Sequence, residues 1–176
     1  MIRGFFRNGA AFMNVHLISD SMDIDETVEF LVDTGASRTT LLDKDAIYLD
    51  MDYDKLPKYK ENLSGIGGSI NTYVIEDASL IIGSTQMDIP VMVGRHPIEK
   101  MTNEELIRTL RIPSLLGRDV INRFRLIFDK EKEELTLGLS DKLLKLQGID
   151  LLKLQVDHGA GIHPGAGGGA IRHPAA

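Results

Sequence analysis

The chain has 176 residues, enough for one domain with a hydrophobic core. Its net charge is −6 without a basic block, which argues against nucleic acid or an anionic membrane as the main partner. Cysteine is absent, which excludes disulfides, cysteine-based zinc sites and cysteine nucleophiles. No apolar run approaches the roughly 20 residues that span a bilayer, and residues 1–13 lack the continuous apolar stretch of a signal peptide. We therefore expect a soluble, cytoplasmic protein.

The first half of the chain has the pattern of a small β-barrel or sandwich, with short strands separated by turns. The expected strands are residues 2–6, 12–18, 27–32, two segments within 63–75, then 78–82 and 87–93. Asn8-Gly9 predicts a turn after the first strand, and Gly83-Ser84 is expected to join the last two. Residues 19–26 are predicted to be a polar loop, and residues 43–59 irregular with one short helical turn.

The second half is expected to hold short helices and a final hairpin. Thr102-Asn103-Glu104-Glu105 predicts a helix start, because acids in the first turn complement the helix dipole. Pro113 ends regular structure, residues 118–124 read as a helix, and residues 126–128 and 134–139 read as a hairpin.

We therefore divide the chain into one domain, residues 1–140, and two further segments. Residues 141–157 contain Leu-Leu-Lys-Leu-Gln twice and are expected to form a helix or an added strand, since periodicity does not decide between them. Residues 158–176 consist largely of Gly, Ala, His and Pro. They cannot bury apolar surface, so we expect a disordered tail.

The most informative feature is Asp33-Thr34-Gly35, which follows the apolar residues 28–32. The end of a strand here delivers a carboxylate into a tight, glycine-containing turn, which holds a reactive side chain rigidly. The alternative is an ordinary turn acid. Residues 156–160 echo the motif faintly but lack the hydroxyl, and we interpret the echo as chance. Chemistry that needs two such carboxylates would therefore require a dimer.

Three segments together resemble the retropepsins, the single-domain aspartic proteases of retroviral type. They are residues 31–37 (Leu-Val-Asp-Thr-Gly-Ala-Ser), 64–68 (Ser-Gly-Ile-Gly-Gly) and 112–119 (Ile-Pro-Ser-Leu-Leu-Gly-Arg-Asp). The first motif alone is a weak signal, but the three in this order and spacing are a strong one. The resemblance implies a mostly β fold, a small closed barrel with one short C-terminal helix, acting as a C2 homodimer. It further implies an aspartic endopeptidase for extended polypeptides that needs no cofactor and no metal.

The resemblance also implies a set of site residues. Asp33 of each subunit activates water between the two carboxylates, Thr34 braces the turns across the axis, and Gly35 permits close approach of backbone and substrate. Residues 65–68 correspond to the flap, a mobile hairpin that covers the substrate. The implied substrate-binding residues are Leu31, Ala36, Ser37, Leu63, Ser64, Gly65, Ile66, Gly67 and Leu115, and the implied structural supports are Gly117 and Arg118.

The chain departs from its relatives beside the catalytic turn. Ser37 stands where viral members commonly carry an acid that pairs with the helix arginine, so Arg118 needs another partner, either Asp119 or a carbonyl. Ala36 stands where pepsin-like relatives have a hydroxyl that donates to the carboxylate, so we expect an optimum less acidic than pepsin's. Arg38 changes the charge near the cleft. Two alternatives stay open: a weakly active or inactive binding or regulatory module, and a latent precursor activated by C-terminal processing.

Overall fold

The computed structural model describes residues 1–60, 63–65 and 68–139. The chain divides into two units, Met1–Ser140 and Asp141–Ala176. The predictions for residues 141–157 and 158–176 lie outside the described residues, as do those for Ile66 and Gly67.

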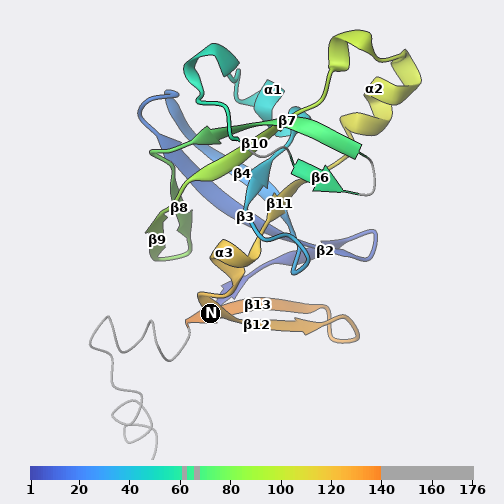
Figure 1. The fold of residues 1–176 in the computed structure, drawn as a ribbon. Helices are drawn as coiled ribbons and strands as arrows, with labels where there is room; N and C mark the ends of the chain where they lie inside the picture. Colours follow the sequence, from blue (N-terminus) through green and yellow to red (C-terminus); the bar gives the residue numbers. More distant parts are fainter. Residues whose placement is uncertain (61–62, 66–67, 140–176) are drawn as a thin grey trace, which may run out of the picture. The chain divides into compact units, whose positions relative to one another are not determined.

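The first unit is built mostly of short strands, which confirms the expected fold class (Figure 1). The strands are β1 (Ile2–Arg3), β2 (Phe5–Arg7), β3 (Ala10–Ser19), β4 (Ile24–Val32), β5 (Thr40–Leu41), β6 (Leu63–Gly65), β7 (Gly68–Ile75), β8 (Ser79–Ile82), β9 (Thr85–Asp88), β10 (Val91–Arg95), β11 (Ser114–Leu116), β12 (Phe124–Asp129) and β13 (Glu134–Leu139). The helices are α1 (Asp43–Tyr48), α2 (Asn103–Thr109) and α3 (Arg118–Ile121), with the 3-10 turns η1 (Tyr53–Lys55) and η2 (Ile98–Lys100). None of the described helices is both long and apolar enough to cross a bilayer.

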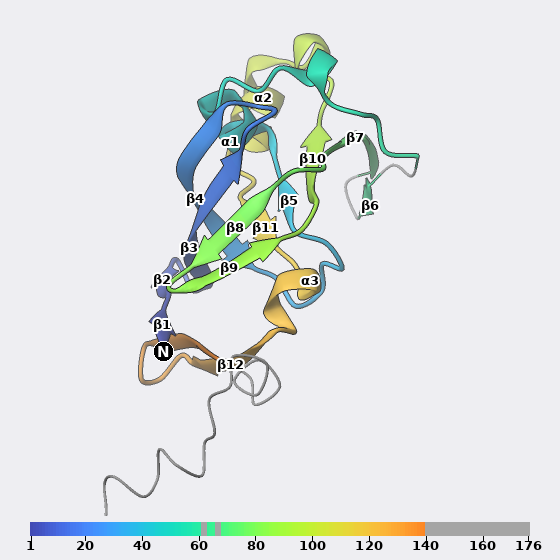
Figure 2. The same ribbon diagram turned by 90° about the vertical axis from the view of Figure 1, so that its left-hand side faces the viewer.

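Most strands belong to one curled sheet, shown from two sides in Figures 1 and 2. Its order is β6-β7-β10-β5-β11-β4-β3-β8-β9, with β2 added to β3. The pairs β11–β4 and β10–β5 are parallel, and the other pairs are antiparallel. Alternating apolar residues of these strands fill the core, among them the fully buried Val15, Leu17, Phe30, Leu80 and Leu116. The parallel pair β11–β4 brings the end of β11 beside the residue that follows β4.

The N-terminal strand is split between two sheets. β1 pairs with β13 in a three-stranded sheet of order β1-β13-β12, whereas β2 pairs with β3 in the main sheet. Gly4 makes the crossing, and a Cβ there would lie 2.5 Å from the backbone oxygen of Phe12. The prediction of one continuous strand over residues 2–6 is therefore wrong. The predicted turn after β2 is confirmed, with φ of 51° at Asn8 and 81° at Gly9.

Other boundaries differ from the predicted ones for local reasons. The β3–β4 ladder continues to the pair Ser19↔Ile24, so the predicted loop over residues 19–26 is shorter. The expected strand over residues 87–93 is two strands, β9 and β10, which Pro90 separates because it has no N–H for the ladder. The expected helix over residues 118–124 ends at Ile121, because Phe124 is buried as the first residue of β12.

The predicted helix start at Thr102 is confirmed. Its hydroxyl accepts a hydrogen bond from the N–H of Glu105 at 3.3 Å, and the Glu105 carboxylate accepts one from the N–H of Thr102 at 2.8 Å. This reciprocal arrangement satisfies two backbone donors and fixes the start of α2.

We use the name α1 corner for Leu42, Asp43, Asp45, His96 and Ser114, where two buried carboxylates join three segments of the chain. Asp43 Oδ1 accepts from the N–H of His96 at 3.0 Å, and Asp43 Oδ2 contacts the Nδ1 of the same histidine. Asp45 Oδ2 accepts a hydrogen bond from Ser114 Oγ at 2.5 Å. Ser114 Oγ in turn accepts a hydrogen bond from the N–H of Leu42 at 3.0 Å. The first turn of α1 thereby fixes the start of β11 and the segment after β10.

Candidate active site

Asp33 follows the last residue of β4 and is tied to β11 through its backbone. Its N–H donates to the carbonyl of Leu116 at 3.1 Å, which extends the parallel β4–β11 ladder by one residue. The N–H of Ala36 donates back to the Asp33 carbonyl at 3.2 Å and closes the turn. The structure therefore confirms that the end of a strand is followed by a tight turn that carries the Asp33 carboxylate.

The carboxylate of Asp33 is half-buried and has few partners. Its Oδ1 accepts from the N–H of Gly35 at 2.8 Å, and no other described residue donates to it or forms an ion pair with it. A Cβ at Gly35 would lie 3.1 Å from the same oxygen, so a side chain there would crowd the carboxylate. The remaining lone pairs can accept from a water molecule or from a protonated carboxyl group.

Gly117 and Arg118, the predicted supports, lie directly against the loop that leaves the turn. A Cβ at Gly117 would lie 2.4 Å from the carbonyl carbon of Arg38, so only glycine fits this approach. The N–H of Arg118 donates to the carbonyl of Ala36 at 2.9 Å, and its Nη1 donates to the carbonyl of Thr34 at 3.4 Å. Of the two partners expected for Arg118, the structure has the carbonyl.

Two residues that brace the turn were not predicted, Thr39 and Asp119. The Asp119 carboxylate accepts from the N–H of Thr39 at 2.9 Å, from its hydroxyl at 2.8 Å and from the N–H of Val120 at 3.0 Å. The Thr39 hydroxyl accepts in turn from the N–H of Gly117 at 3.1 Å. These contacts join segments that are far apart in the chain, and no spacing in the sequence indicated them. Asp119 was considered only as a partner of Arg118.

The predicted substrate-binding residues of the first and third motifs lie together around the turn. Leu31 and Leu115 are directly in register on the neighbouring strands β4 and β11, and both are half-buried. Ala36 is also half-buried, whereas Thr34 and Ser37 are exposed. An apolar surface therefore adjoins the carboxylate and remains partly accessible.

The described residues of the second motif, Ser64, Gly65 and Gly68, lie in the hairpin β6–β7. Its register, Leu63↔Ile70, Ser64↔Ser69 and Gly65↔Gly68, puts its described end next to residues 66 and 67. β7 continues the hairpin into the main sheet by pairing with β10. In both ribbon views the loop that follows β4 lies beneath this hairpin (Figures 1 and 2). The assignment of this hairpin as a flap stays a prediction.

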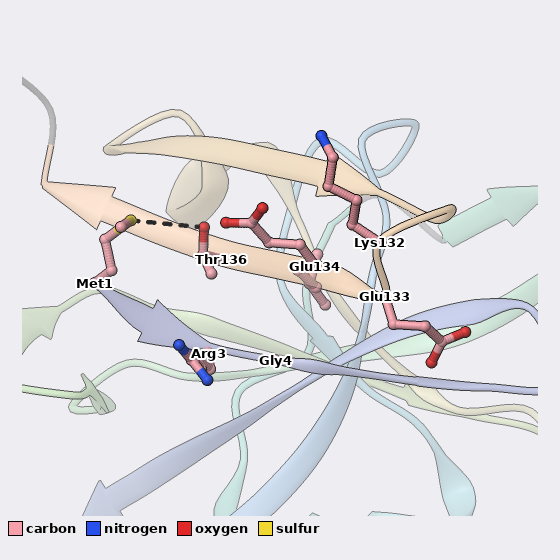
Figure 3. Close-up of a pocket in the computed structure, with 8 residues that line it drawn as sticks. Met1, Arg3, Gly4, Lys132, Glu133, Glu134 and Thr136 are labelled. Atoms are coloured by element: carbon pink, nitrogen blue, oxygen red, sulfur yellow. Dashed lines mark hydrogen bonds between the residues drawn. The ribbon is translucent and has the colours of Figure 1, made fainter.

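A hollow of about 490 Å³ lies elsewhere, beside β1 and β13 (Figure 3). Its charged side chains, Arg3, Lys132, Glu133 and Glu134, point in different directions instead of converging on one point. It contains none of the predicted site residues. Nor do the described residues contain a group of three or more His, Cys, Asp or Glu arranged to hold a metal ion.

Comparison with known proteins finds one protein family and several solved structures that are similar to the chain. The model of the family described as "gag-polyprotein putative aspartyl protease" matches residues 23–123. The chain is similar to a retropepsin-like aspartic protease from Rickettsia conorii in its crystal structure, with 26% identity, a TM-score of 0.50 and coverage of 78% of this chain and 88% of that one. The EIAV protease complexed with the inhibitor HBY-793 also matches, with 19% identity, a TM-score of 0.43 and coverage of 65% and 88%. No curated protein matches the chain.

The family match spans more than half of the chain and includes the Asp33 turn, the β6–β7 hairpin and the Gly117-Arg118 support. The expected mostly β fold is confirmed, since the curled sheet predominates here and the chain as a whole is similar to the Rickettsia protein with a TM-score of 0.50. The chain therefore belongs to the gag-polyprotein aspartyl protease family, the retropepsin-like aspartic proteases.

Proposed function

We propose that the protein is an aspartic endopeptidase that hydrolyses extended polypeptides as a homodimer. The observation that carries the proposal is the state of Asp33 in a member of a protease family. The backbone N–H of Asp33 donates to Leu116, and the Asp33 carboxylate accepts from the N–H of Gly35. The carboxylate still has lone pairs without a described partner. This is the condition of an acid that binds water and not of one that holds the fold.

Catalysis needs the Asp33 of both subunits. Two carboxylates a few ångströms apart do not both ionise, so one stays protonated while the other is a base. The base takes a proton from a water molecule, whose oxygen attacks the carbonyl carbon of the scissile bond. The protonated carboxyl donates to the carbonyl oxygen, which gives a tetrahedral gem-diol. Proton transfer to the nitrogen then breaks the C–N bond and releases an amine and a carboxylic acid.

The dimer follows from the single copy of the motif. Asp33-Thr34-Gly35 occurs once in these 176 residues, so we assign the second carboxylate to a second copy related by a two-fold axis. Within the described residues, β1 and β12 are the two edges of the smaller sheet, and each presents backbone groups that a second copy can pair with. β1 already pairs with β13 of its own chain.

The substrate is a polypeptide in extended conformation. The β6–β7 hairpin offers backbone groups above the turn, as in recognition by strand addition. Leu31 and Leu115 offer apolar contacts to the side chains around the scissile bond. Thr34, Ser37 and the residues at the tip of the hairpin complete the proposed contacts.

The activity optimum of this enzyme is expected to be less acidic than pepsin's. Position 36 is alanine, so it supplies no hydroxyl to stabilise the ionised carboxylate. Such an optimum suits the cytoplasm, which we propose as its compartment.

The test is cleavage of a diverse peptide library between pH 4 and 8 by the wild type and by Asp33→Asn, with the oligomeric state of the same samples measured by analytical ultracentrifugation. We expect cleavage by the wild type alone, in proportion to the dimer. A well-folded dimer without cleavage would contradict the proposal and favour a binding or regulatory module. Release of the C-terminal residues by the wild type alone would identify the latent precursor.

A further inference from the structure

A hollow of about 450 Å³ lies between the loop that leaves the Asp33 turn and the segment that leads into the β6–β7 hairpin. We propose that it is a second recognition site of the substrate, which binds an acidic side chain of the polypeptide away from the scissile bond. The inference rests on the proposed function and assigns a substrate class to it. The residues that carry it are Arg38, Lys58, Lys60, Glu76 and Met92.

One wall of the hollow is fixed to the Asp33 turn. Arg38 lies in the same loop as Asp33, and its backbone packs against Gly117. The next residue, Thr39, is fully buried and its N–H is held by Asp119 at 2.9 Å. The position of Arg38 relative to the carboxylate is therefore set by the same bonds that hold the turn.

The opposite wall belongs to the hairpin. Residues 57–59 pair with β7, because the N–H of Tyr59 donates to the carbonyl of Thr72 at 2.8 Å and the N–H of Val74 donates to the carbonyl of Pro57 at 3.1 Å. Lys58 is opposite Tyr73 in the same pairing. β7 is the second arm of the hairpin, so the hollow borders both elements between which we propose that the substrate binds.

The charge of the hollow is opposite to that of the whole protein. Arg38, Lys58 and Lys60 line it, and Glu76 is the one acid among its lining residues, in a chain whose net charge is −6. The three cations are exposed, and none forms an ion pair with a carboxylate in the part of the chain that the structure describes. Arg7 and Arg95, by contrast, each bind a glutamate at 2.6 Å and 2.7 Å. The hollow thus holds cations that lack a described partner.

These cations are suited to a carboxylate. A guanidinium presents a planar fork that can bind both oxygens, and the two ammonium groups add charge without geometric demand. Val74, Pro90 and Met92 add apolar surface for the methylene groups of an aspartate or glutamate. Because the proposed dimer is symmetric, the hollow occurs twice, so an acid is favoured at equivalent positions on both sides of the scissile bond.

The experiment compares three proteins on the same peptide library. They are the wild type, the triple variant Arg38→Gln, Lys58→Gln, Lys60→Gln, and a control variant Lys100→Gln, Arg108→Gln, Lys132→Gln with the same change in net charge. We expect the wild type and the control to favour Asp or Glu at a fixed position away from the cleaved bond. In the triple variant kcat/KM for these peptides falls roughly tenfold, while peptides without the acid are cleaved as before.

Failure of this inference and failure of the proposed function give different results. Cleavage without an acidic preference, or a preference that is unchanged in the triple variant, contradicts the acid-binding role of the hollow. Either result is still consistent with the proposed protease function. If no peptide is cleaved, the anisotropy of a fluorescein-labelled decapeptide with a Leu-Leu centre and outer glutamates is measured against its glutamine counterpart, using Asp33→Asn with and without the triple substitution. Glutamate-dependent binding that the triple substitution removes supports the hollow, and its absence overturns it.

Discussion

The Asp33 turn and the α1 corner use their carboxylates in opposite ways. In the α1 corner, Asp43 and Asp45 are 2% and 6% exposed, and hydrogen bonds from His96 and Ser114 hold them. In the turn, Asp33 is half-buried and accepts one hydrogen bond, from Gly35, among the described residues.

The difference separates acids that stabilise the fold from an acid that is available for chemistry. A buried carboxylate destabilises the protein unless donors replace its lost hydration, which is why Asp43 and Asp45 are surrounded by donors. Asp119 belongs with them, because it accepts from Thr39 and Val120. The backbone hydrogen bonds of Asp33 hold the turn, so its carboxylate is not required for that role.

The largest expected effect is the loss of activity in Asp33→Asn with little change in stability. General acid–base catalysis contributes roughly 10²–10⁴-fold, and we expect kcat/KM to fall at least that far. The free energy of unfolding should change by less than about 0.5 kcal/mol, because few bonds depend on this side chain. Peptide cleavage and urea unfolding measure the two quantities. A loss of several kcal/mol in stability would place Asp33 with the structural acids.

Gly117→Ala tests whether the turn depends on the close approach of β11. The new Cβ would lie 2.4 Å from the carbonyl carbon and 2.6 Å from the oxygen of Arg38, and backbone atoms cannot move aside as a side chain can. We expect a loss of about 3 kcal/mol, the upper end of overpacking. Thermal unfolding measures it, and Gly138→Ala is the matched control, since its nearest neighbour would be 3.8 Å away. Equal behaviour of the two variants would show that the turn tolerates displacement.

Asp43→Ala tests the α1 corner. It removes the acceptor of the His96 N–H and the partner of the imidazole, and bonds to a charged group contribute about 1.5–3 kcal/mol. We expect a loss of stability in that range. A double-mutant cycle with His96→Ala isolates the contact of Asp43 with the imidazole, and a coupling energy near zero would show that Asp43 acts through the backbone N–H of His96 and not through the ring. Exposed Asp54→Ala provides the comparison, with a change within about 0.5 kcal/mol.

Local patterns in the sequence predicted the parts of the fold that depend on neighbouring residues. Asn8-Gly9, the capped start at Thr102 and the strand predicted over residues 12–18 each have a cause within a few residues. The Asp33 turn was predicted for the same reason, since a strand followed by Asp-Thr-Gly indicates a turn at the end of that strand.

The rest depends on contacts between distant segments, which no local pattern encodes. Asp119 holds Thr39 across 80 positions, and Asp45 holds Ser114 across 69. Residues 43–59 were predicted to be polar and irregular, because acidic residues such as Asp43 and Asp45 are expected at the surface. Their burial could not be predicted without knowing which residues donate hydrogen bonds to their carboxylates. The charge of the second hollow was likewise not visible in the sequence, since Arg38 and Lys58 come from separate segments that the fold brings to one hollow.

The smallest expected effect concerns Tyr53, which lies beside the α1 corner. Burial, with the negative charge of Asp43, raises the pKa of Tyr53 to about 12, although Arg95 lies over its ring at 4.6 Å and opposes the shift. The neutral phenol is therefore favoured in the folded protein. In the unfolded chain the phenol ionises near its ordinary pKa of 10, so stability is unaffected below pH 10 and falls as the pH rises toward 12.

An alkaline titration measures this effect by the absorbance of the phenolates. We expect a step near pH 12 in the wild type and expect this step to be missing in Tyr53→Phe. Asp43→Asn should lower the pKa of that step, because it removes the charge that disfavours the phenolate while burial remains. The same titration thus connects the smallest effect to the α1 corner. An unchanged step in Asp43→Asn would mean that burial alone sets the pKa of Tyr53, and that the carboxylate of Asp43 is screened from the ring by its bonds to His96.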